Sequence, residues 1–392
     1  MLVIQKYGGS SLATPKQIQN AAQRIADLRK SGSQVVVVAS AMGRMTDHLL
    51  RLAEKTVKVP PPREIDMLLT AGERISMSLL SMALQELGVA AISFTGSQSG
   101  IITTDDHTDA KIIDIRPYRI CEELALGKVV IIGGFQGVSE KKEITTLGRG
   151  GSDTTAVALA AVLQADRCEI LTDVNGLYSA DPRLVPEARI LTSVDYESAL
   201  ELASLGAKMQ ARSIELAKKF NVNIRISSSS SQTTEGTQIP LSLKKSGTAI
   251  EQIKVTGVAT KDGFHFFKTQ SEMVTLLKAL KNIPVPLRFL SHQKTGVYFL
   301  IEKEQVVLVR QILTEQNINF EETQNTAIVS VLGESLTHSI EFFTSVFSQI
   351  EMEKIDLLFS TSNAISVTFG VGAKHQELLA RFIHKTFITS KD

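Results

Sequence analysis

Residues 2–11 read LVIQKYGGSS, an apolar run that passes into a loop of glycine and serine. Its first five residues have the length and composition of a short strand. Thr14-Pro15 then predicts a helix start, because Thr14 can cap the first turn and proline suits the first helical position. Apolar residues continue at helical spacing until Gly32. We interpret this stretch as the strand, loop and helix that open an α/β domain.

Strand and helix signals keep alternating through the first 230 residues. Residues 35–39 form an apolar, β-branched run, as expected of a strand that is buried on both faces. Residues 66–87 predict a long helix that ends at Gly88. Further strands are predicted at 89–94, 129–133, 169–171 and 223–227, and an alanine-rich helix at 152–164. This alternation favours a largely parallel sheet with helices on both faces.

The order of predicted strands and helices changes after residue 230. Residues 231–250 are polar and contain Gly236 and Gly247, and we predict a linker there, after a first domain at 1–230. Beyond the linker, the order strand, helix, strand, strand, helix occurs twice. The repeat predicts two α+β ferredoxin-like units, at 251–323 and 324–392. Paired small units of this kind favour a homodimer or a higher homo-oligomer.

The bulk composition excludes several classes of partner. The 392 residues carry 42 basic and 41 acidic side chains, so neither nucleic acid nor an anionic membrane is expected as the main partner. No apolar run reaches the ~20 residues of a membrane span, and the first residues lack the pattern of a signal peptide. Cys121 and Cys168 have no metal-ligand spacing around them. We therefore expect a cytoplasmic protein with two reduced thiols and no metal held by the chain itself.

Three loops carry residues that suit phosphate chemistry. Residues 6–11, KYGGSS, combine Lys6 with two glycines whose N–H groups can approach phosphate oxygens closely. Residues 148–155, GRGGSDTT, place Arg149 at a helix start, where anions bind favourably. Residues 172–183, TDVNGLYSADPR, offer groups that can surround a nucleotide. Each loop alone is as consistent with an ordinary turn, and GxxxxGK[ST], HRD and DFG motifs are absent, so the pattern indicates only a phosphate- or anion-binding α/β enzyme.

Taken together, the motifs resemble those of the aspartate kinases in the amino-acid kinase family. The resemblance rests on residues 6–11, on LLTAGER at 68–74, FTG at 94–96, GGFQG at 133–137 and TLGRGGSD at 146–153. Residues 172–183 share it, and the motifs keep the family's order up to about residue 230. The resemblance implies a three-layer αβα sandwich with a mostly parallel sheet, followed by two ACT domains.

The same resemblance implies roles for individual residues. Lys6 and Asp153 would be catalytic, with Asp153 orienting Lys6 and the reacting groups. Glu73 would meet the substrate ammonium group, and Arg149 would take its α-carboxylate. The other substrate-side residues would be Ser40, Thr46 and Ser152. With Lys6, the residues that hold ATP would be Gly8, Gly9 and Ser10 at the phosphates and Thr172, Asp173, Tyr178, Asp181, Arg183 and Lys208 in the nucleotide pocket.

The implied reaction is the ATP-dependent phosphorylation of the L-aspartate side-chain carboxylate, which gives 4-phospho-L-aspartate and ADP. It is the first step toward lysine, threonine and methionine, and Mg²⁺ would be held mainly by the nucleotide phosphates. The nucleophile has a reference pKa of ~3.9, so it is already ionised and needs no general base. The ACT resemblance implies a lysine or threonine effector. The first unit departs from the family pattern, because TQSE at 269–272 lacks the usual glycine and proline and Ser291-His292 replaces a Gln-Asn pair.

Two alternatives stay open at this point. A kinase of glutamate or a related acid would share the fold, although the segments around Glu73 and Arg149 resemble the aspartate version. A catalytically weak, amino-acid-binding regulatory subunit would share the scaffold. Such a subunit would not need to keep Lys6, Glu73, Arg149 and Asp153 together.

Overall fold

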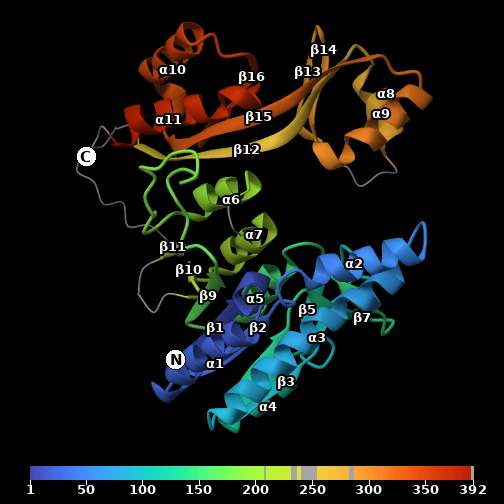
Figure 1. Cartoon of the computed structure of the whole chain (residues 1–392), viewed down its shortest axis with the longest axis vertical. Coiled ribbons are helices and arrows are strands. Elements are labelled where there is room, and N and C mark those ends of the chain that lie inside the picture. The colour runs from blue at the N-terminus through green and yellow to red at the C-terminus, as the bar shows by residue number, and fades with distance from the viewer. Residues whose placement is uncertain (207–208, 231–235, 240–253, 282–286, 390–392) are drawn as a thin grey trace. The chain divides into compact units, whose positions relative to one another are not determined.

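The computed structural model of the chain describes residues 1–206, 209–230, 236–239, 254–281 and 287–389 (Figure 1). The chain divides into two compact units, each with its own sheet and hydrophobic core. The first consists of Met1–Leu177 and Ile190–Thr248, and the second of Tyr178–Arg189 and Ala249–Asp392. Among the described residues, no helix combines the length and the apolar character that a membrane span requires.

A seven-stranded sheet forms the centre of the first unit, with the strand order β11-β10-β9-β1-β2-β6-β3. Every neighbouring pair runs parallel except β10 and β11. The strands are β1 (Leu2–Tyr7), β2 (Gln34–Ala39), β3 (Ala91–Phe94), β6 (Val129–Gly133), β9 (Arg167–Thr172), β10 (Ile224–Ser228) and β11 (Thr237–Ile239). Val36 and Val37 point to opposite faces of β2 and both are fully buried, as expected of a central strand that is covered on both sides.

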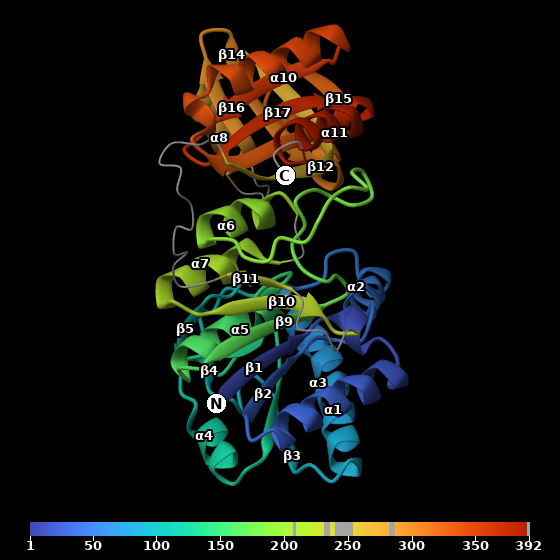
Figure 2. The same cartoon turned by 90° about the vertical axis from the view of Figure 1, so that its left-hand side faces the viewer.

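Helices cover both faces of this sheet (Figure 2). On one face, α1 (Pro15–Lys30) and α3 (Pro62–Glu86) share a core with alternate residues of β2 and β6. On the other face, α5 (Gly151–Val162) contacts β1, β2 and β9 and packs against α7 (Ala211–Phe220). Thr14 caps α1, since its side chain accepts a hydrogen bond from the Gln17 N–H. The predicted cap of the first helix is thus confirmed.

Several elements of the first unit have no clear signal in the sequence. They include the helices α2 (Met45–Thr56), α4 (Tyr118–Ala125), α6 (Tyr196–Ser204) and α7. They also include a second sheet, β5-β4-β7-β8, whose strands are β4 (Ile101–Thr103), β5 (Ile112–Ile115), β7 (Gln136–Ser139) and β8 (Ile144–Thr146). Strands of three or four residues are too short to show a periodic pattern, and α2 has no fully buried side chain to produce one.

The second unit is built on a six-stranded antiparallel sheet, with the strand order β13-β14-β12-β15-β17-β16. The predicted order of strand, helix, strand, strand, helix occurs twice. The first copy contains β12 (Lys254–Thr269), α8 (Met273–Leu280), β13 (Arg288–Gln293), β14 (Gly296–Glu302) and α9 (Val306–Glu315). The second contains β15 (Phe320–Glu334), α10 (Ile340–Met352), β16 (Leu357–Ser362), β17 (Ser366–Gly372) and α11 (Gln376–Phe387).

The two copies share their longest strands. β12 and β15 are 16 and 15 residues long and pair with each other through several register shifts. Val255 and Val258, in the first part of β12, lie in one core with α10 and α11, whereas Phe267, in its second part, lies in another core with α8 and α9. Residues 254–261, which the sequence places in the first α+β unit, therefore pack with the second.

The segment Tyr178–Arg189 also differs from the expected division of the chain. The sequence places it in the first domain, but Ala180 and Val185 lie in the core formed with α10 and α11. The Val258 N–H donates a hydrogen bond to the Ser179 carbonyl O at 2.7 Å. Of the predicted linker at 231–250, only 236–239 belong to the described residues, and they include strand β11.

Candidate active site

The first loop of the candidate site follows strand β1. Lys6 stands near the end of β1, and Gly9 opens a short 3-10 turn. A larger residue at Gly9 is excluded, because its Cβ would lie 2.9 Å from the carbonyl O of Ala41. The Gly43 N–H donates to the Gly9 carbonyl O at 2.9 Å. The loop after β1 is therefore packed directly on the loop after β2, which contains Ser40.

The second loop leads into helix α5. Gly148 and Gly150 have φ of +78° and +75°, in the left-handed region that favours glycine. They turn the chain so that Ser152 and Asp153 fall in the first turn of α5. The N-cap residue of this helix is Gly150, which has no side chain to cap it. The partial positive charge of a helix N-terminus favours an anion at such a position.

A buried ion pair joins these two loops. Lys6 Nζ lies 2.6 Å from Asp153 Oδ1, and the two side chains are 12% and 7% exposed. Little solvent reaches the pair, so it is weakly screened, and removal of one partner would leave a buried charge uncompensated. The Gly8 N–H donates to the Leu171 carbonyl O at the end of β9. The carboxyl ends of β1 and β9 and the start of α5 thus meet at Lys6.

Glu73 reaches the loop after β2 from helix α3. Its Oε1 accepts a hydrogen bond from the Ala41 N–H at 3.1 Å, while its Oε2 is buried with no hydrogen-bond partner in the described part of the chain. Burial raises the pKa of Glu73 to about 7, and the Ala41 N–H offsets part of this effect. Ser76, one turn later, donates to the Ser40 carbonyl O at 2.7 Å. The buried carboxylate is suited to a cationic group that could supply the missing partner.

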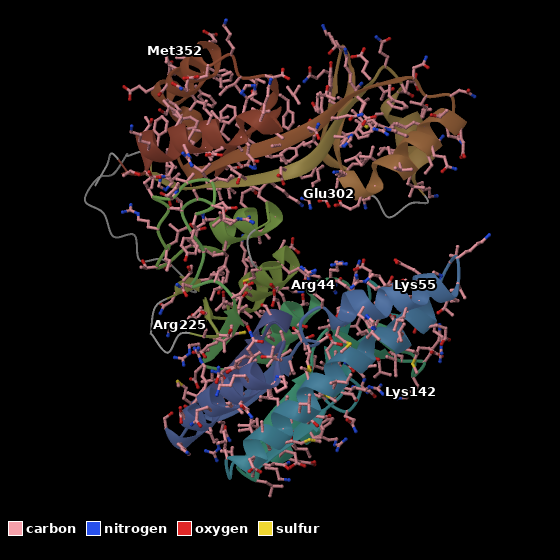
Figure 3. The ribbon with its side chains drawn as sticks, viewed as in Figure 1. Arg44, Lys55, Lys142, Arg225, Glu302 and Met352 are labelled. Carbon is pink, nitrogen blue, oxygen red and sulfur yellow. The ribbon has the colours of Figure 1, made fainter. Side chains whose placement is uncertain are left out.

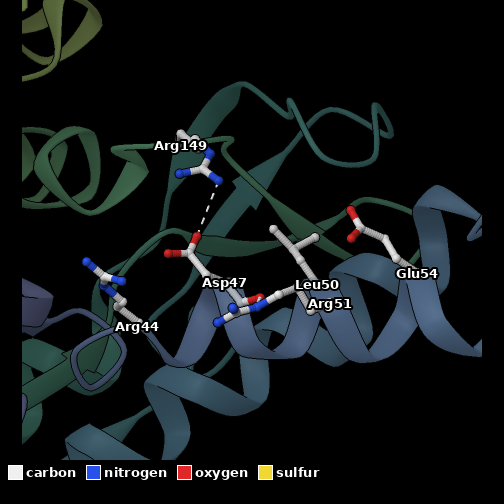
Figure 4. A pocket seen from close by; sticks show the side chains of 6 residues that line it. All are labelled: Arg44, Asp47, Leu50, Arg51, Glu54 and Arg149. Carbon is white, nitrogen blue, oxygen red and sulfur yellow. Dashed lines mark hydrogen bonds and ion pairs between the residues drawn. The ribbon is translucent and has the colours of Figure 1, made fainter. Parts of the chain in front are cut away.

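Arg149 is a largely exposed residue of the second loop. Its guanidinium extends toward α2, where Nη2 lies 3.3 Å from Asp47 Oδ1, and its side chain is 85% exposed (Figure 4). Thr46 precedes Asp47 in the first turn of the same helix. The backbone of Arg149 is fixed, since its carbonyl O accepts a bond of 2.6 Å from Gln210. The main chain of this loop is therefore held while the side chain of Arg149 lies in solvent.

The predicted nucleotide residues fall in different parts of the chain. Thr172 and Asp173 follow β9 in the first unit, and the Thr172 hydroxyl donates to the Asp173 carboxylate at 3.1 Å. Tyr178, Asp181 and Arg183 belong to the second unit, where Arg183 pairs with Asp181 at 2.6 Å. That pairing lowers the pKa of Asp181. Lys208 lies outside the described residues.

Residues that the sequence does not single out support the second loop. One is Gln210, which holds the Arg149 carbonyl. Another is Asp66 of α3, which is fully buried and accepts a hydrogen bond of 2.5 Å from the Thr146 hydroxyl. Its other oxygen lies 2.8 Å from His107 Nδ1. No sequence motif marks these residues, because each contact joins parts of the chain that lie far apart.

The mostly parallel sheet, with helices on both faces and glycine loops at the carboxyl ends of its strands, places the chain in the α/β class of proteins. The model of the amino acid kinase family matches residues 1–228. Aspartokinase 2 of Bacillus subtilis is 39% identical over an alignment that covers 100% of this chain and 98% of that protein. The chain therefore belongs to the amino acid kinase family, within its aspartokinase branch. The predicted resemblance to the aspartate kinases is confirmed.

Other aspartokinases match more strongly over a shorter region. The aspartokinase of Corynebacterium glutamicum is 54% identical over 261 residues, which make up 66% of this chain and 61% of that protein. That of Mycobacterium tuberculosis strain H37Rv is 54% identical over 260 residues, again 66% and 61%. The matched part of the chain thus spans about 61% of the length of these relatives.

Solved structures share the fold. Aspartokinase III of E. coli in complex with aspartate and ADP has a TM-score of 0.82 at 21% identity, over 98% of this chain and 99% of that chain. The aspartate kinase of Clostridium acetobutylicum has a TM-score of 0.76 at 22% identity, over 98% and 100%. The predicted fold class, a mostly parallel α/β unit followed by antiparallel α+β units, is confirmed.

Proposed function

We propose that this chain transfers the γ-phosphoryl group of ATP to the side-chain carboxylate of L-aspartate, giving 4-phospho-L-aspartate and ADP. The observation that carries the proposal is the buried pair of Lys6 and Asp153, 2.6 Å apart, at the point where the first two glycine loops meet. The likeness to aspartokinases along the full chain supports the choice of aspartate as the phosphoryl acceptor.

Charge is the main obstacle to this reaction. The acceptor carboxylate is ionised at neutral pH and must approach the anionic γ-phosphate. Lys6 offsets the repulsion, and the N-terminus of α5 adds a partial positive charge. Asp153 orients the Lys6 ammonium group. Catalysis then consists mainly of positioning and electrostatic stabilisation, as in other phosphoryl transfers.

The nucleotide phosphates are assigned to the loop of Gly8, Gly9 and Ser10, which follows Lys6 at the end of β1 and whose N–H groups can approach phosphate oxygens. In the proposal, Mg²⁺ is held mainly by the phosphates and neutralises part of their charge. The base and ribose are assigned to the remaining predicted residues, namely Thr172, Asp173, Tyr178, Asp181, Arg183 and Lys208.

The amino acid is recognised at both of its charged groups. Glu73 takes the ammonium group, which would give its buried Oε2 a partner. Arg149 takes the α-carboxylate through two parallel hydrogen bonds. Ser40, Thr46 and Ser152 complete the substrate side of the site.

The second unit would bind lysine or threonine as an effector and would join two or more copies of the chain. One structure that shares the fold, E. coli aspartokinase III, is in complex with lysine and aspartate. The product would enter the synthesis of lysine, threonine and methionine, and the reaction would take place in the cytoplasm.

Hydroxamate formation with ATP, Mg²⁺ and hydroxylamine tests the proposal. The full chain is expected to convert L-aspartate and to convert L-glutamate far more slowly. Lys6→Met should abolish the signal, whereas the control Lys30→Met, at the exposed end of α1, should retain it. A preference for L-glutamate over L-aspartate would instead favour a kinase of glutamate or a related acid. No hydroxamate from a folded chain that still binds amino acids would favour the regulatory subunit.

A further inference from the structure

Helix α2 forms one wall of a surface hollow next to the second loop. The hollow has a volume of about 330 Å³ and is lined by Arg44, Asp47, Leu50, Arg51, Glu54 and Arg149. Figure 4 shows the Asp47 carboxylate pointing from α2 toward the Arg149 guanidinium across the hollow. Arg44 stands at the start of α2 and Lys55 in its last turn, as labelled in Figure 3.

The contact between Asp47 and Arg149 is a weak one. A single pair of atoms, Oδ1 and Nη2, approaches to 3.3 Å, although an arginine fork can bind both oxygens of a carboxylate. Both partners are open to water, with side-chain exposures of 45% and 85%. Exposed ion pairs of this kind contribute little to stability and exchange easily. Asp47 therefore leaves most of the hydrogen-bonding capacity of Arg149 unused.

The geometry also separates the fixed part of Arg149 from its movable part. Gln210 anchors the Arg149 carbonyl at 2.6 Å, and Gly150 has a left-handed φ of +75° that sets the turn behind it. Among the described residues, only Asp47 forms a hydrogen bond or ion pair with the guanidinium of Arg149. The side chain of Arg149 can therefore change partner without a change in the loop.

We propose that Asp47 is a positioning residue for the substrate site. Its carboxylate occupies the guanidinium of Arg149 when no amino acid is bound, and the α-carboxylate of the substrate replaces it. This inference rests on the proposed function in one respect, the assignment of Arg149 to the α-carboxylate. The exchange keeps Arg149 paired in both states. In the free state it places the negative charge of Asp47 beside the guanidinium, where it competes with the carboxylate of the ligand. A ligand therefore displaces Asp47 favourably only when it offers a carboxylate that binds both sides of the arginine fork.

Removal of the competitor should tighten substrate binding. Asp47→Asn keeps the shape of the side chain and removes its charge, so the dissociation constant for L-aspartate should fall by about two- to fivefold, in line with an exposed ion pair. A purely structural role for Asp47 would weaken binding or leave it unchanged, since a damaged site does not bind its ligand more tightly. Glu54→Gln is the matched control, because Glu54 lines the same hollow and makes no contact with Arg149 there.

Calorimetric titration of the full chain with L-aspartate, without ATP, measures this effect apart from turnover. Titration with β-alanine, which keeps the ammonium group and the reacting carboxylate but lacks the α-carboxylate, adds a second arm. We expect tighter binding of L-aspartate in Asp47→Asn, none of this gain in Glu54→Gln, and no change for β-alanine in either variant. Unchanged or weaker binding of L-aspartate in Asp47→Asn, with an active wild type, overturns the role of Asp47 alone. A wild type that neither binds L-aspartate nor forms hydroxamate overturns the proposed function as well.

Discussion

Lys6 Nζ lies 2.6 Å from Asp153 Oδ1, and this single contact ties the end of strand β1 to the first turn of helix α5. The two residues come from distant parts of the sequence, and each lies next to a glycine-containing loop. Because both side chains are nearly buried, the orientation of the Lys6 ammonium group depends on the charge of Asp153.

Asp153→Asn should therefore reduce turnover far more than it reduces substrate binding. The amide keeps the size of the side chain but no longer orients Lys6, and we expect kcat to fall by roughly 10²–10³-fold, as for the loss of one electrostatic contact to a transition state. Initial rates with ATP and L-aspartate, together with calorimetry, measure the two quantities. Asp166→Asn is the control, because Asp166 accepts a bond from the Leu2 N–H at the opposite end of β1. Similar losses in both variants would mean that the pair is only structural.

The affinity for L-aspartate should depend on the ionisation of Glu73. Burial raises the pKa of this carboxyl to about 7, so below that pH it becomes protonated and cannot pair with the substrate ammonium group. We expect kcat/KM for L-aspartate to be highest above pH 7 and to fall by up to about tenfold per unit below it. Rates between about pH 5.5 and 8.5 test this. Glu73→Gln should raise KM and remove the fall of kcat/KM below about pH 7. A fall that persists in Glu73→Gln would mean that another group causes it.

Gly150 and Gly88 allow the cost of backbone strain to be separated from the shape of the loop. Both have φ of +75°, but a Cβ on Gly150 would lie 3.0 Å from Gln210 Cδ, whereas one on Gly88 would meet nothing within 4 Å. Alanine at either site should lower the free energy of unfolding by about 1–2 kcal/mol. Only Gly150→Ala should also raise KM for L-aspartate, because it displaces the side chain that holds Arg149. Urea unfolding and steady-state rates provide the two readouts. Equal KM values in the two variants would contradict this role of Gln210.

The sequence predicts the parts of this fold that local chemistry determines. The apolar run of β2 indicates a strand buried on both faces, and Thr14 with Gly88 marks helix ends, because these signals need no knowledge of distant residues. The position of Tyr178–Arg189 could not be predicted in this way. It depends on Ala180 and Val185 packing into a core whose other members lie much later in the chain.

The residues of the candidate site likewise fall into those that local motifs indicate and those that only distant contacts bring to the site. Lys6 and Asp153 stand out because each lies in a motif of its own, and the resemblance to a family connects them. Asp47 and Gln210 lie in no such motif, and their importance comes from contacts with Arg149 that only the folded chain creates. Composition and spacing therefore predict the loops, but they do not predict the residues that hold those loops in place.

His384 links helix α11 to the segment Tyr178–Arg189. Its Nε2 lies 2.9 Å from the Ser179 hydroxyl and its Nδ1 3.2 Å from that of Thr389. The Arg189 N–H donates to Ser179 Oγ, so the Ser179 O–H can donate to a neutral His384, and a proton on Nε2 would remove that acceptor. Burial lowers the pKa of His384.

A histidine whose folded pKa lies below its ordinary value contributes stability above about pH 6.5 and loses it as the pH falls, because the unfolded chain then binds the proton more readily. We therefore expect protection of α11 and of Tyr178–Arg189 from hydrogen exchange, corrected for the intrinsic rate, to decrease between about pH 7 and 5.5. His384→Asn should lower protection at pH 7 and flatten this dependence. His338→Asn, at an exposed histidine before α10, should leave both unchanged. A pH dependence that survives in His384→Asn would show that another group controls the attachment of this segment.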